Sequence, residues 1–352
     1  METPPLYSFG IPWPELNGGL DYSDLVRSAD SGKTLIGFYS SRYPNSAPLR
    51  GWLRRIRSGQ VTVDGEAATD PDAVLELGCR VVYRRIPWRE PDAPWTLQVL
   101  YEDEHMVAIN KPSGLQVLPG GLFQQRTVLS QLQWRAWRPQ PPAPVHRLGR
   151  GTSGVLLCAK TRSAKTRLSS YFARGTLGAG EEGRGIRKFY RALVVGLVVE
   201  DEIVVDQPIG MVHYPGVANG LYVASPDGKP ASSDVRVLER DAEAERTLVE
   251  VEIHSGRPHQ IRIHMAFVGH PLFGDPLYGV GGCPEFSEES VSIDDGFAED
   301  GGYEKPMRPV PGDCGYHLHA HRLVLCHPST NETVEITAPL PAILQTRTEL
   351  DH

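Results

Sequence analysis

No apolar run in the 352 residues reaches the roughly 20 that a membrane-spanning helix needs. The N-terminal stretch METPPLYSFGIPWPELNGGLDYSD has neither a basic start nor an apolar core, so it fits neither a secretory signal nor a transit peptide. Cysteine is scarce and odd in number: the five cysteines are scattered, which is typical of reduced thiols. We therefore expect a protein of the cytosol or the nucleus.

Basic charge is also in deficit, since the formal net charge is −7. This argues against a nucleic-acid partner until the distribution of charge is considered. Residues 285–304 hold eight acids and no base: Glu285, Glu288, Glu289, Asp294, Asp295, Glu299, Asp300 and Glu304. Without those eight acids the net charge becomes +1. We expect this stretch to be a solvated, disordered loop that leaves a positive surface possible elsewhere.

A small unit with a basic helix lies between about residues 34 and 85. Its predicted helix has apolar residues at helical spacing on one face, namely Leu49, Leu53 and Ile56. Three arginines share another face and a fourth adds charge: Arg50, Arg54, Arg57 and Arg55. Asp64-Gly65 in VTVDGE predicts a hairpin turn. A phosphate-binding surface and a merely solvated helix face both remain open.

The rest of the chain predicts an α+β domain built on a largely antiparallel sheet. We expect a tail over residues 1–31, the small unit over 32–86, a stiff Pro-rich linker over 87–96 and the large domain over 97–345. From residue 97 onward, short apolar runs alternate with turns, and helical patterns occur only near 127–138 and 163–174. Loop insertions are expected near 175–186 and 280–314.

Residues 145–160 read VHRLGRGTSGVLLCAK, and GRGTSG fits the G-x-G-x-x-G spacing of dinucleotide sites. Such a site needs a helix directly after the glycines, so that its N-terminus faces a pyrophosphate. Here residues 155–159 are an apolar run typical of a buried strand. A P-loop would need Gly-Lys-Ser/Thr, and a nucleophile elbow would need glycine where Val155 stands. The context therefore disfavours a nicotinamide cofactor.

This stretch is one of five that match a single family: YEDEHMVAINKPSGLQV at 101–117, VHRLGRGTSGVLLCAK at 145–160, KFYRALVVG at 188–196, GRPHQIRIHMAFVGHPLFGDPLYG at 256–279 and HAHRLVLCHP at 319–328. Together they resemble the RluA-like RNA pseudouridine synthases. WLRRIRSGQVTVDGE at 52–66 resembles an S4-type (αL-type) RNA-binding domain, which often precedes that catalytic domain. The resemblance covers roughly residues 34–345.

The resemblance implies an enzyme that detaches uracil from its ribose, rotates it and rejoins it through carbon, without a metal or organic cofactor. Its partner would be RNA, from which the target nucleotide is flipped into a pocket. We expect a monomer. By the same resemblance, Arg262 stands where the family has its carboxylate-pairing arginine and Tyr190 where it has its base-stacking tyrosine. His146 and Arg147 are expected to touch the RNA backbone or the space that the flipped base leaves.

Gly149 departs from this pattern, because the family has its catalytic aspartate there. Glycine can neither attack nor accept a proton. A nearby hydroxyl would need an adjacent base, and His146 is the only near candidate. A positive φ at Gly149 would strain any side chain placed there. Two interpretations stay open, an active pseudouridine synthase and a catalytically silent RNA-binding relative, with a nicotinamide oxidoreductase as a distant third.

Simpler interpretations of these residues also exist. Tyr190 suits a core aromatic in an apolar strand, and the alternation around Arg262 suits a surface strand. Asp275 in GDPLYG is interpreted as a turn residue before Pro276 rather than as a replacement nucleophile. Several residues near the C-terminus hint at zinc, although their spacing does not match the usual paired motifs: His317, His319, His321, Cys314, Cys326 and His327.

Overall fold

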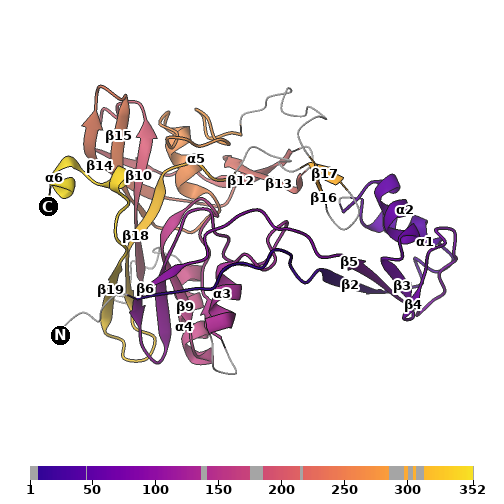
Figure 1. The fold of residues 1–352 in the computed structure, drawn as a ribbon. Coiled ribbons are helices and arrows are strands. Elements are labelled where there is room, and N and C mark those ends of the chain that lie inside the picture. The colour runs from indigo at the N-terminus through magenta and orange to yellow at the C-terminus, as the bar shows by residue number, and fades with distance from the viewer. Residues whose placement is uncertain are drawn as a thin grey trace.

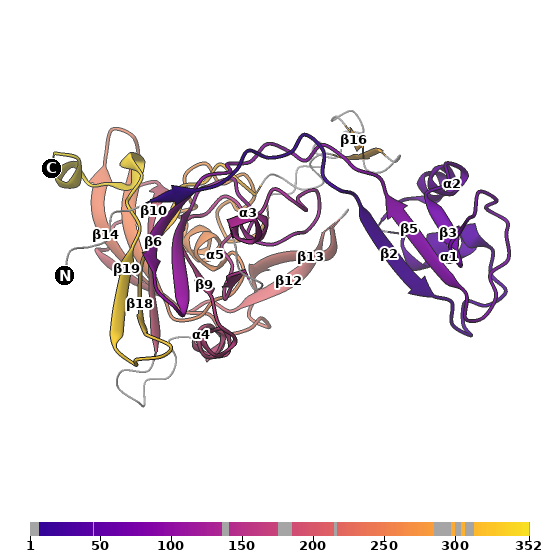
Figure 2. The same cartoon turned by 60° about the horizontal axis from the view of Figure 1, so that its bottom comes forward.

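A computed structural model describes residues 7–44, 46–135, 141–174, 185–214, 217–284, 297–299, 304–306 and 313–351. The chain forms a large unit around one extensive sheet and a small unit set apart from it (Figure 1). Two runs of chain lie side by side between the units (Figure 2). Each helix in the described part of the chain is too short or too polar to cross a membrane.

The large sheet has eleven strands, and the order along its main path is β1-β6-β7-β9-β18-β10-β15-β14-β11. The strands are β1 (Ser8–Phe9), β6 (Leu97–Glu102), β7 (Met106–Lys111), β8 (Ala143–Pro144), β9 (Ser153–Ala159), β10 (Ile186–Val195), β11 (Glu202–Val205), β14 (Ser233–Asp241), β15 (Arg246–Ile253), β18 (Leu318–Cys326) and β19 (Thr333–Thr337). All pairs are antiparallel except β9 with β18. The predicted α+β class with a largely antiparallel sheet is confirmed.

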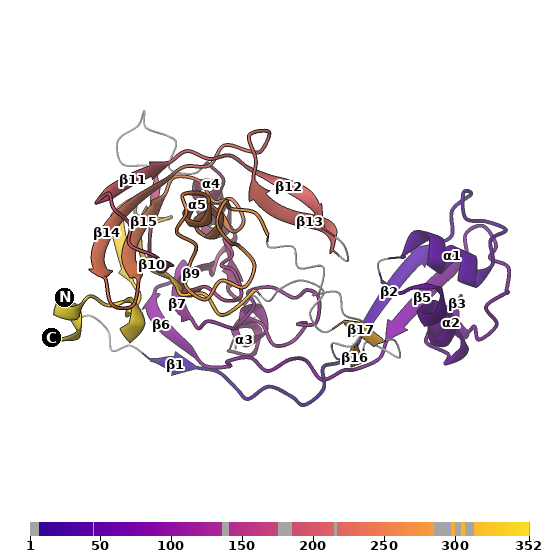
Figure 3. The ribbon, with the colours of Figure 1, turned by 90° about the horizontal axis from the view of Figure 1, so that it is seen from above.

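Three helices cover the face of this sheet that looks toward the small unit (Figure 3). They are α3 (Val128–Arg135), α4 (Arg162–Arg174) and α5 (Gln260–Phe267). Helices α3 and α4 match the helical patterns near 127–138 and 163–174. Ala164 and Leu168 of α4 are buried with Val155 and Leu157 of β9 in one hydrophobic core. The 3-10 helix η2 (Ala342–Leu344) and α6 (Arg347–Leu350) lie near the C-terminus.

A separate hairpin of β12 (Ile209–Tyr214) and β13 (Val217–Ala224) packs beside α5. Strands β16 (Phe297–Glu299) and β17 (Glu304–Pro306) pair at the C-terminal end of the acidic stretch, where we expected a disordered loop. The rest of that stretch lies outside the described residues, as does most of the predicted insertion at 175–186. Ile186, at the end of that insertion, already belongs to β10.

The small unit packs α1 (Leu35–Arg42) and α2 (Leu49–Arg57) on a sheet of order β2-β5-β3-β4. Its strands are β2 (Leu20–Leu25), β3 (Val61–Val63), β4 (Glu66–Ala67) and β5 (Arg80–Arg85). The predicted hairpin is confirmed, because β3 and β4 pair across Asp64 and Gly65, whose φ angles are 49° and 92°. The predicted tail over 1–31 is wrong: β2 belongs to this sheet, and β1 pairs with β6 of the large one.

The face that α2 buries differs from the prediction. Trp52, Arg55 and Ile56 are buried, whereas Leu49 is 56% exposed. The guanidinium of Arg55 lies 4.6 Å from the ring centroid of Trp52 and 4.7 Å from that of Tyr83. Its Nη1 donates to the Ser46 hydroxyl at 3.1 Å. The expectation that Arg55 touches RNA is therefore wrong, because this cation completes the small unit's core.

The connection between the two units is held by one buried carboxylate. Residues 87–96 run beside the N-terminal segment, where the Trp13 indole donates to the Ala93 carbonyl at 2.7 Å. Glu90 is 2% exposed and accepts hydrogen bonds from the Asn17 amide and from three backbone N–H groups, at residues 124, 125 and 126. The Pro-rich stretch is thus anchored to the large unit by its carboxylate as well as stiffened by proline.

Candidate active site

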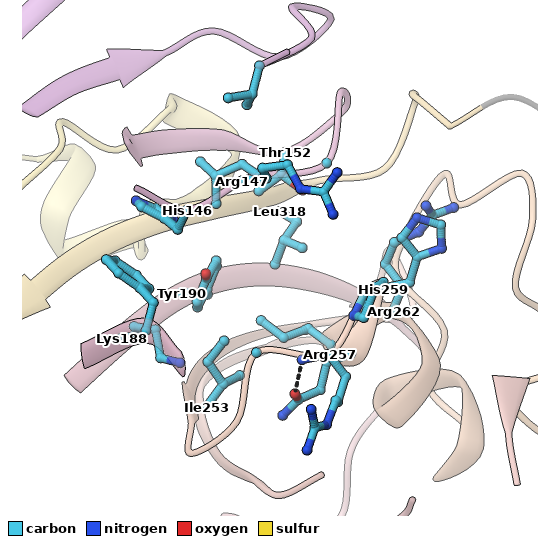
Figure 4. Close-up of a pocket in the computed structure, with 18 of the residues that line it drawn as sticks. His146, Arg147, Thr152, Lys188, Tyr190, Ile253, Arg257, His259, Arg262 and Leu318 are labelled. Atoms are coloured by element: carbon cyan, nitrogen blue, oxygen red, sulfur yellow. Dashed lines mark hydrogen bonds between the residues drawn. The ribbon is translucent and has the colours of Figure 1, made fainter. Parts of the chain in front are cut away.

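A cavity of about 740 Å³ opens between the loop that follows β8, strand β10 and the start of α5 (Figure 4). Its cationic and polar lining comes from segments far apart in the sequence: His146, Arg147, Thr152, Lys188, Tyr190, Arg257, His259, Gln260, Arg262 and Tyr316. Gly149 also lines it. None of the described residues that line the cavity is Asp or Glu. The described part of the lining therefore presents cations and no carboxylate to a ligand.

The glycines of GRGTSG allow close backbone contacts and hold no cofactor. Strand β9 begins at Ser153, so a strand and not a helix leaves the motif; this excludes the dinucleotide interpretation. Gly154 has φ +105°, and a Cβ there would stand 2.2 Å from the Ala320 carbonyl oxygen on β18. A Cβ on Gly151 would stand 2.7 Å from the Asp313 carbonyl oxygen. Only glycine fits at either position.

The KPSG segment, residues 111–114, begins at the last residue of β7 and binds the carbonyl groups of this loop. Lys111 is fully buried, and its ammonium donates to the carbonyls of residues 112, 115 and 150. The Ser113 hydroxyl donates to the Gly151 carbonyl at 2.7 Å. These bonds fix the turn from Gly149 to Gly151 at the rim of the cavity.

Gly149 is not in the left-handed region, so the strain expected for a side chain there does not come from φ. The obstacle is steric. A Cβ on Gly149 would stand 2.8 Å from the Tyr316 hydroxyl and 3.3 Å from the Thr152 hydroxyl. Those two hydroxyls lie 3.2 Å apart. Tyr316 therefore fills the space that a side chain at position 149 would enter.

Arg262 lies on helix α5, so the simpler interpretation as a surface strand residue is wrong. Its side chain is 2% exposed, and its Nε and Nη2 donate to the two carboxylate oxygens of Asp275, each at 2.7 Å. Burial acts to lower the pKa of Arg262, but the bond to Asp275 outweighs this effect and raises it. The third nitrogen, Nη1, is buried without a hydrogen-bond partner among the described residues. It remains available to a group that enters the cavity.

Asp275 has a turn role as interpreted, because it also accepts the backbone N–H groups of Leu277 and Tyr278. The bidentate pair with Arg262 was not foreseen. The Arg262 guanidinium lies 4.9 Å from the ring centroid of Tyr278 and 4.2 Å from that of Tyr316. Two aromatic faces and one carboxylate thus hold this arginine at the cavity.

Tyr190 and Lys188 point into the cavity from β10, two residues apart and on one face of the strand (Figure 4). Burial raises the pKa of Tyr190, so its phenol is neutral at pH 7. Burial lowers the pKa of Lys188 to about 8, and its ammonium donates to the Ser255 carbonyl at 3.0 Å. Tyr190 is half-buried at the cavity rather than enclosed in the core.

The side chain of His146 is held by contacts within the protein, whereas that of Arg147 is exposed to solvent. The His146 ring stacks on Phe172 at 4.2 Å, and its Nε2 accepts the Leu157 N–H at 2.9 Å. Burial and then the charge of Lys188 lower the pKa of His146 to about 3. Its Nε2 lone pair is occupied, so this nitrogen cannot serve as the base for a neighbouring hydroxyl. Arg147 is exposed at the rim of the cavity.

Sequence reasoning missed several cationic or polar residues of the cavity, including Lys188, Arg257, His259, Gln260 and Tyr316. The two-residue alternation with Tyr190 would have indicated Lys188. Arg257 and His259 belong to GRPHQ, just before Arg262, and burial lowers the pKa of His259 to about 4. Tyr316 stands three residues before the 319–328 stretch, and no pattern in the sequence links it to Gly149.

The zinc hint has no geometric support within the described part of the chain, where no three His, Cys, Asp or Glu side chains surround a possible metal position. His319 bonds to the Ser153 hydroxyl at 2.8 Å, and His327 bonds to Asp103 at 2.8 Å. His321 lies 3.0 Å from the Ala338 carbonyl. These histidines have other partners.

Comparison with known proteins gives consistent matches. A family model described as RNA pseudouridylate synthase matches residues 105–267. The chain is 61% identical to RNA pseudouridine synthase 5 of Oryza sativa subsp. japonica over 99% of its own length and 94% of that protein. It is 58% identical to RNA pseudouridine synthase 5 of Arabidopsis thaliana, over 99% and 100%. Identity to ribosomal large subunit pseudouridine synthase D of Pseudomonas aeruginosa is 33%, covering 83% of each chain.

Proposed function

Because this chain belongs to the RNA pseudouridine synthase family, we propose that it binds RNA and isomerises a uridine to pseudouridine in the cavity beside Gly149. The observation that carries the proposal is the cavity itself, which joins a half-buried tyrosine, a buried arginine and further cations in a space of about 740 Å³. A single flipped nucleotide needs such a space, with a ring to stack on and cations for its phosphates.

The residues have separate roles in this proposal. The Tyr190 ring stacks on the flipped uracil. Arg147, at the rim, pairs with the RNA backbone, and Arg257, held by its Nε bond to the Pro230 carbonyl at 3.0 Å, borders the same opening. Arg262 uses its free Nη1 to hold negative charge that develops during the reaction. Cleavage of the glycosidic bond pushes electrons into uracil, and such a cationic pocket stabilises that anion.

The small unit supplies further affinity as an S4-like RNA-binding domain. Arg50, Arg54 and Arg57 are exposed along one side of α2, and no ion pair engages them within the described residues. Arg55, in the core, is not part of this surface. Phosphate contacts of this kind raise affinity without reading sequence.

A catalytically silent RNA-binding protein is the second candidate, favoured by one observation: no described carboxylate lines the cavity. The two candidates share a fold and an RNA-binding surface, and they differ only in turnover.

The test is to incubate the purified protein with RNA from cells that lack it and to map pseudouridine before and after. Site-specific formation supports the synthase. RNA binding without any new pseudouridine, under multiple-turnover and single-turnover conditions, rejects it in favour of the silent protein. A Tyr190→Ala variant is the matched control, because it removes the stacking ring and should form no pseudouridine.

A further inference from the structure

No carboxylate lines the cavity among the described residues, but a phenol stands where a side chain at position 149 would begin. The Tyr316 hydroxyl stands 2.8 Å from the point where a Cβ of residue 149 would be. Tyr316 is 4% exposed and lines the cavity. It lies 126 residues after Tyr190 and belongs to neither of the motifs around 149 or 262. Among the described residues, and apart from the two chain neighbours of Gly149, only Tyr316 brings a titratable group within 4 Å of that point.

The surroundings of Tyr316 suit a reacting oxygen. Its ring faces the Arg262 guanidinium, with 4.2 Å between the guanidinium carbon and the ring centroid. A phenol is far more acidic than the Thr152 hydroxyl beside it, and a nearby cation stabilises a phenolate. Burial raises the pKa of Tyr316, while the charge of Arg262 and the hydrogen bond with Thr152 act against this rise. The fixed Asp275 bond keeps Arg262 in place for that role.

The other nearby groups are engaged elsewhere. The Asp313 carboxylate accepts both Nε and Nη2 of Arg150 and does not line the cavity. Asp275 is engaged by Arg262 and two backbone N–H groups. The Nε2 of His146 accepts a backbone N–H, so this nitrogen cannot activate Thr152.

Resting on the proposed function, we propose that the Tyr316 oxygen replaces the missing aspartate as the nucleophile toward C1′ of the target ribose. In the first step, the O–C1′ bond forms as the C1′–N1 bond breaks. The electron pair passes to uracil, and the phenol proton ends on N1. After the base turns, C5 forms the new bond to C1′ as the Tyr316–C1′ bond breaks. The pair returns to the oxygen, which takes the proton from C5. The net change moves one proton from C5 to N1, and no oxidant or reductant is consumed.

Tyr316→Phe tests this directly, because it removes the oxygen and keeps the ring over Arg262. We expect the single-turnover rate of pseudouridine formation to fall by about 100-fold or more, with RNA affinity and thermal stability near those of the wild type. Tyr101→Phe is the matched control: it also removes a hydrogen-bonded phenol oxygen, but Tyr101 lies on β6 and does not line the cavity. That variant should retain turnover. Acid-quenched reactions of the wild type should yield a ribose adduct on the peptide that contains Tyr316.

The outcomes separate the two proposals. A wild type that forms pseudouridine as fast as Tyr316→Phe overturns the role of Tyr316 and leaves the synthase proposal standing. An inactive wild type that binds RNA rejects the synthase proposal and this one with it. A pH profile adds a second readout, because a phenol nucleophile should give a single-turnover rate that rises from neutral into alkaline pH. A rate that is flat from pH 6 to 9 in the wild type contradicts a phenol nucleophile.

Discussion

Arg262 and Asp275 form a bidentate ion pair whose side chains are only 2% and 1% exposed. Asp275 is the one acidic residue in the 256–279 stretch, and the ion pair leaves its carboxylate unavailable as a nucleophile. The pair also fixes the guanidinium through its Nε and Nη2. The remaining nitrogen, Nη1, has no hydrogen-bond partner among the described residues. Removing one partner of such a buried ion pair destabilises the folded protein, because the other charge stays buried without compensation.

Asp275→Asn should therefore act on stability as well as on turnover. It leaves the buried Arg262 charge without its anion, and we expect a loss of about 3–5 kcal/mol in the free energy of unfolding. Denaturant titration of the purified variant measures this. The double variant Arg262→Met/Asp275→Leu should recover much of the stability and none of the activity. Normal stability in Asp275→Asn would show that the ion pair contributes little.

A second prediction concerns Gly149→Asp. The new Cβ meets the Tyr316 hydroxyl at 2.8 Å, so the single variant should be destabilised and slow to form pseudouridine. Removing that oxygen as well makes room, and Gly149→Asp/Tyr316→Phe should place a carboxylate near Arg262 and react faster than Tyr316→Phe alone. Single-turnover assays of the three variants compare them. Equal rates for the double variant and Tyr316→Phe would mean that the carboxylate does not reach the sugar.

The basic helix gives a third prediction. Replacing Arg50, Arg54 and Arg57 with Gln should weaken RNA binding and reduce its salt slope by about three at most, since each phosphate contact contributes a little under one. Binding titrations at several salt concentrations measure both. Arg347→Gln, on α6 at the other end of the molecule (Figure 1), is a single-charge control that should leave the slope unchanged. An unchanged salt slope in the triple variant would show that these arginines form a solvated helix face and do not contact RNA phosphates.

Glu90 gives a fourth prediction about the connection between the units. Glu90→Gln turns one acceptor oxygen into a donor that faces backbone N–H groups, and it removes the charge that strengthens the remaining bonds. We expect a loss of about 2–3 kcal/mol and faster proteolysis between the units. Glu15→Gln, an exposed acid on the neighbouring run, is the control. Equal proteolysis of both variants would mean that Glu90 does not hold the connection.

A fifth prediction follows from the buried histidines. The pKa of His146 is lowered to about 3 and that of His259 to about 4. Below an unfolded-state pKa of about 6.5, the unfolded chain therefore binds more protons than the folded one. Their contribution to stability is intact above pH 6.5 and declines as pH falls from 6.5 toward 3. Thermal unfolding between pH 8 and 4 measures the decline, and His146→Phe should flatten part of it. An unchanged slope in that variant would contradict the lowered pKa.

The sequence by itself determined the parts that depend on local pattern. Alternating apolar runs predicted the sheet, three-to-four-residue spacing predicted α2, α3 and α4, and Asp64-Gly65 predicted the hairpin, because these signals arise from near neighbours. The resemblance of residues 188–196 and 256–279 to a known family, and not their periodicity, pointed to Tyr190 and Arg262. Local patterns could not show that β2 joins the small sheet, because its residues pair with residues of β5 that are 55 to 65 positions away.

Tertiary structure decided which side chains meet. The arginines of α2 look alike in sequence, yet Arg55 is buried against Trp52 and Tyr83. The other three, Arg50, Arg54 and Arg57, are exposed to solvent. The sequence shows only that position 149 has no side chain. The folded structure adds that the Tyr316 hydroxyl lies 2.8 Å from where a Cβ of residue 149 would be. The pairing of β9, β18 and β10 in the sheet determines that these side chains lie close together. The short-range pattern of residues around 149 or around 316 carries no information about that pairing.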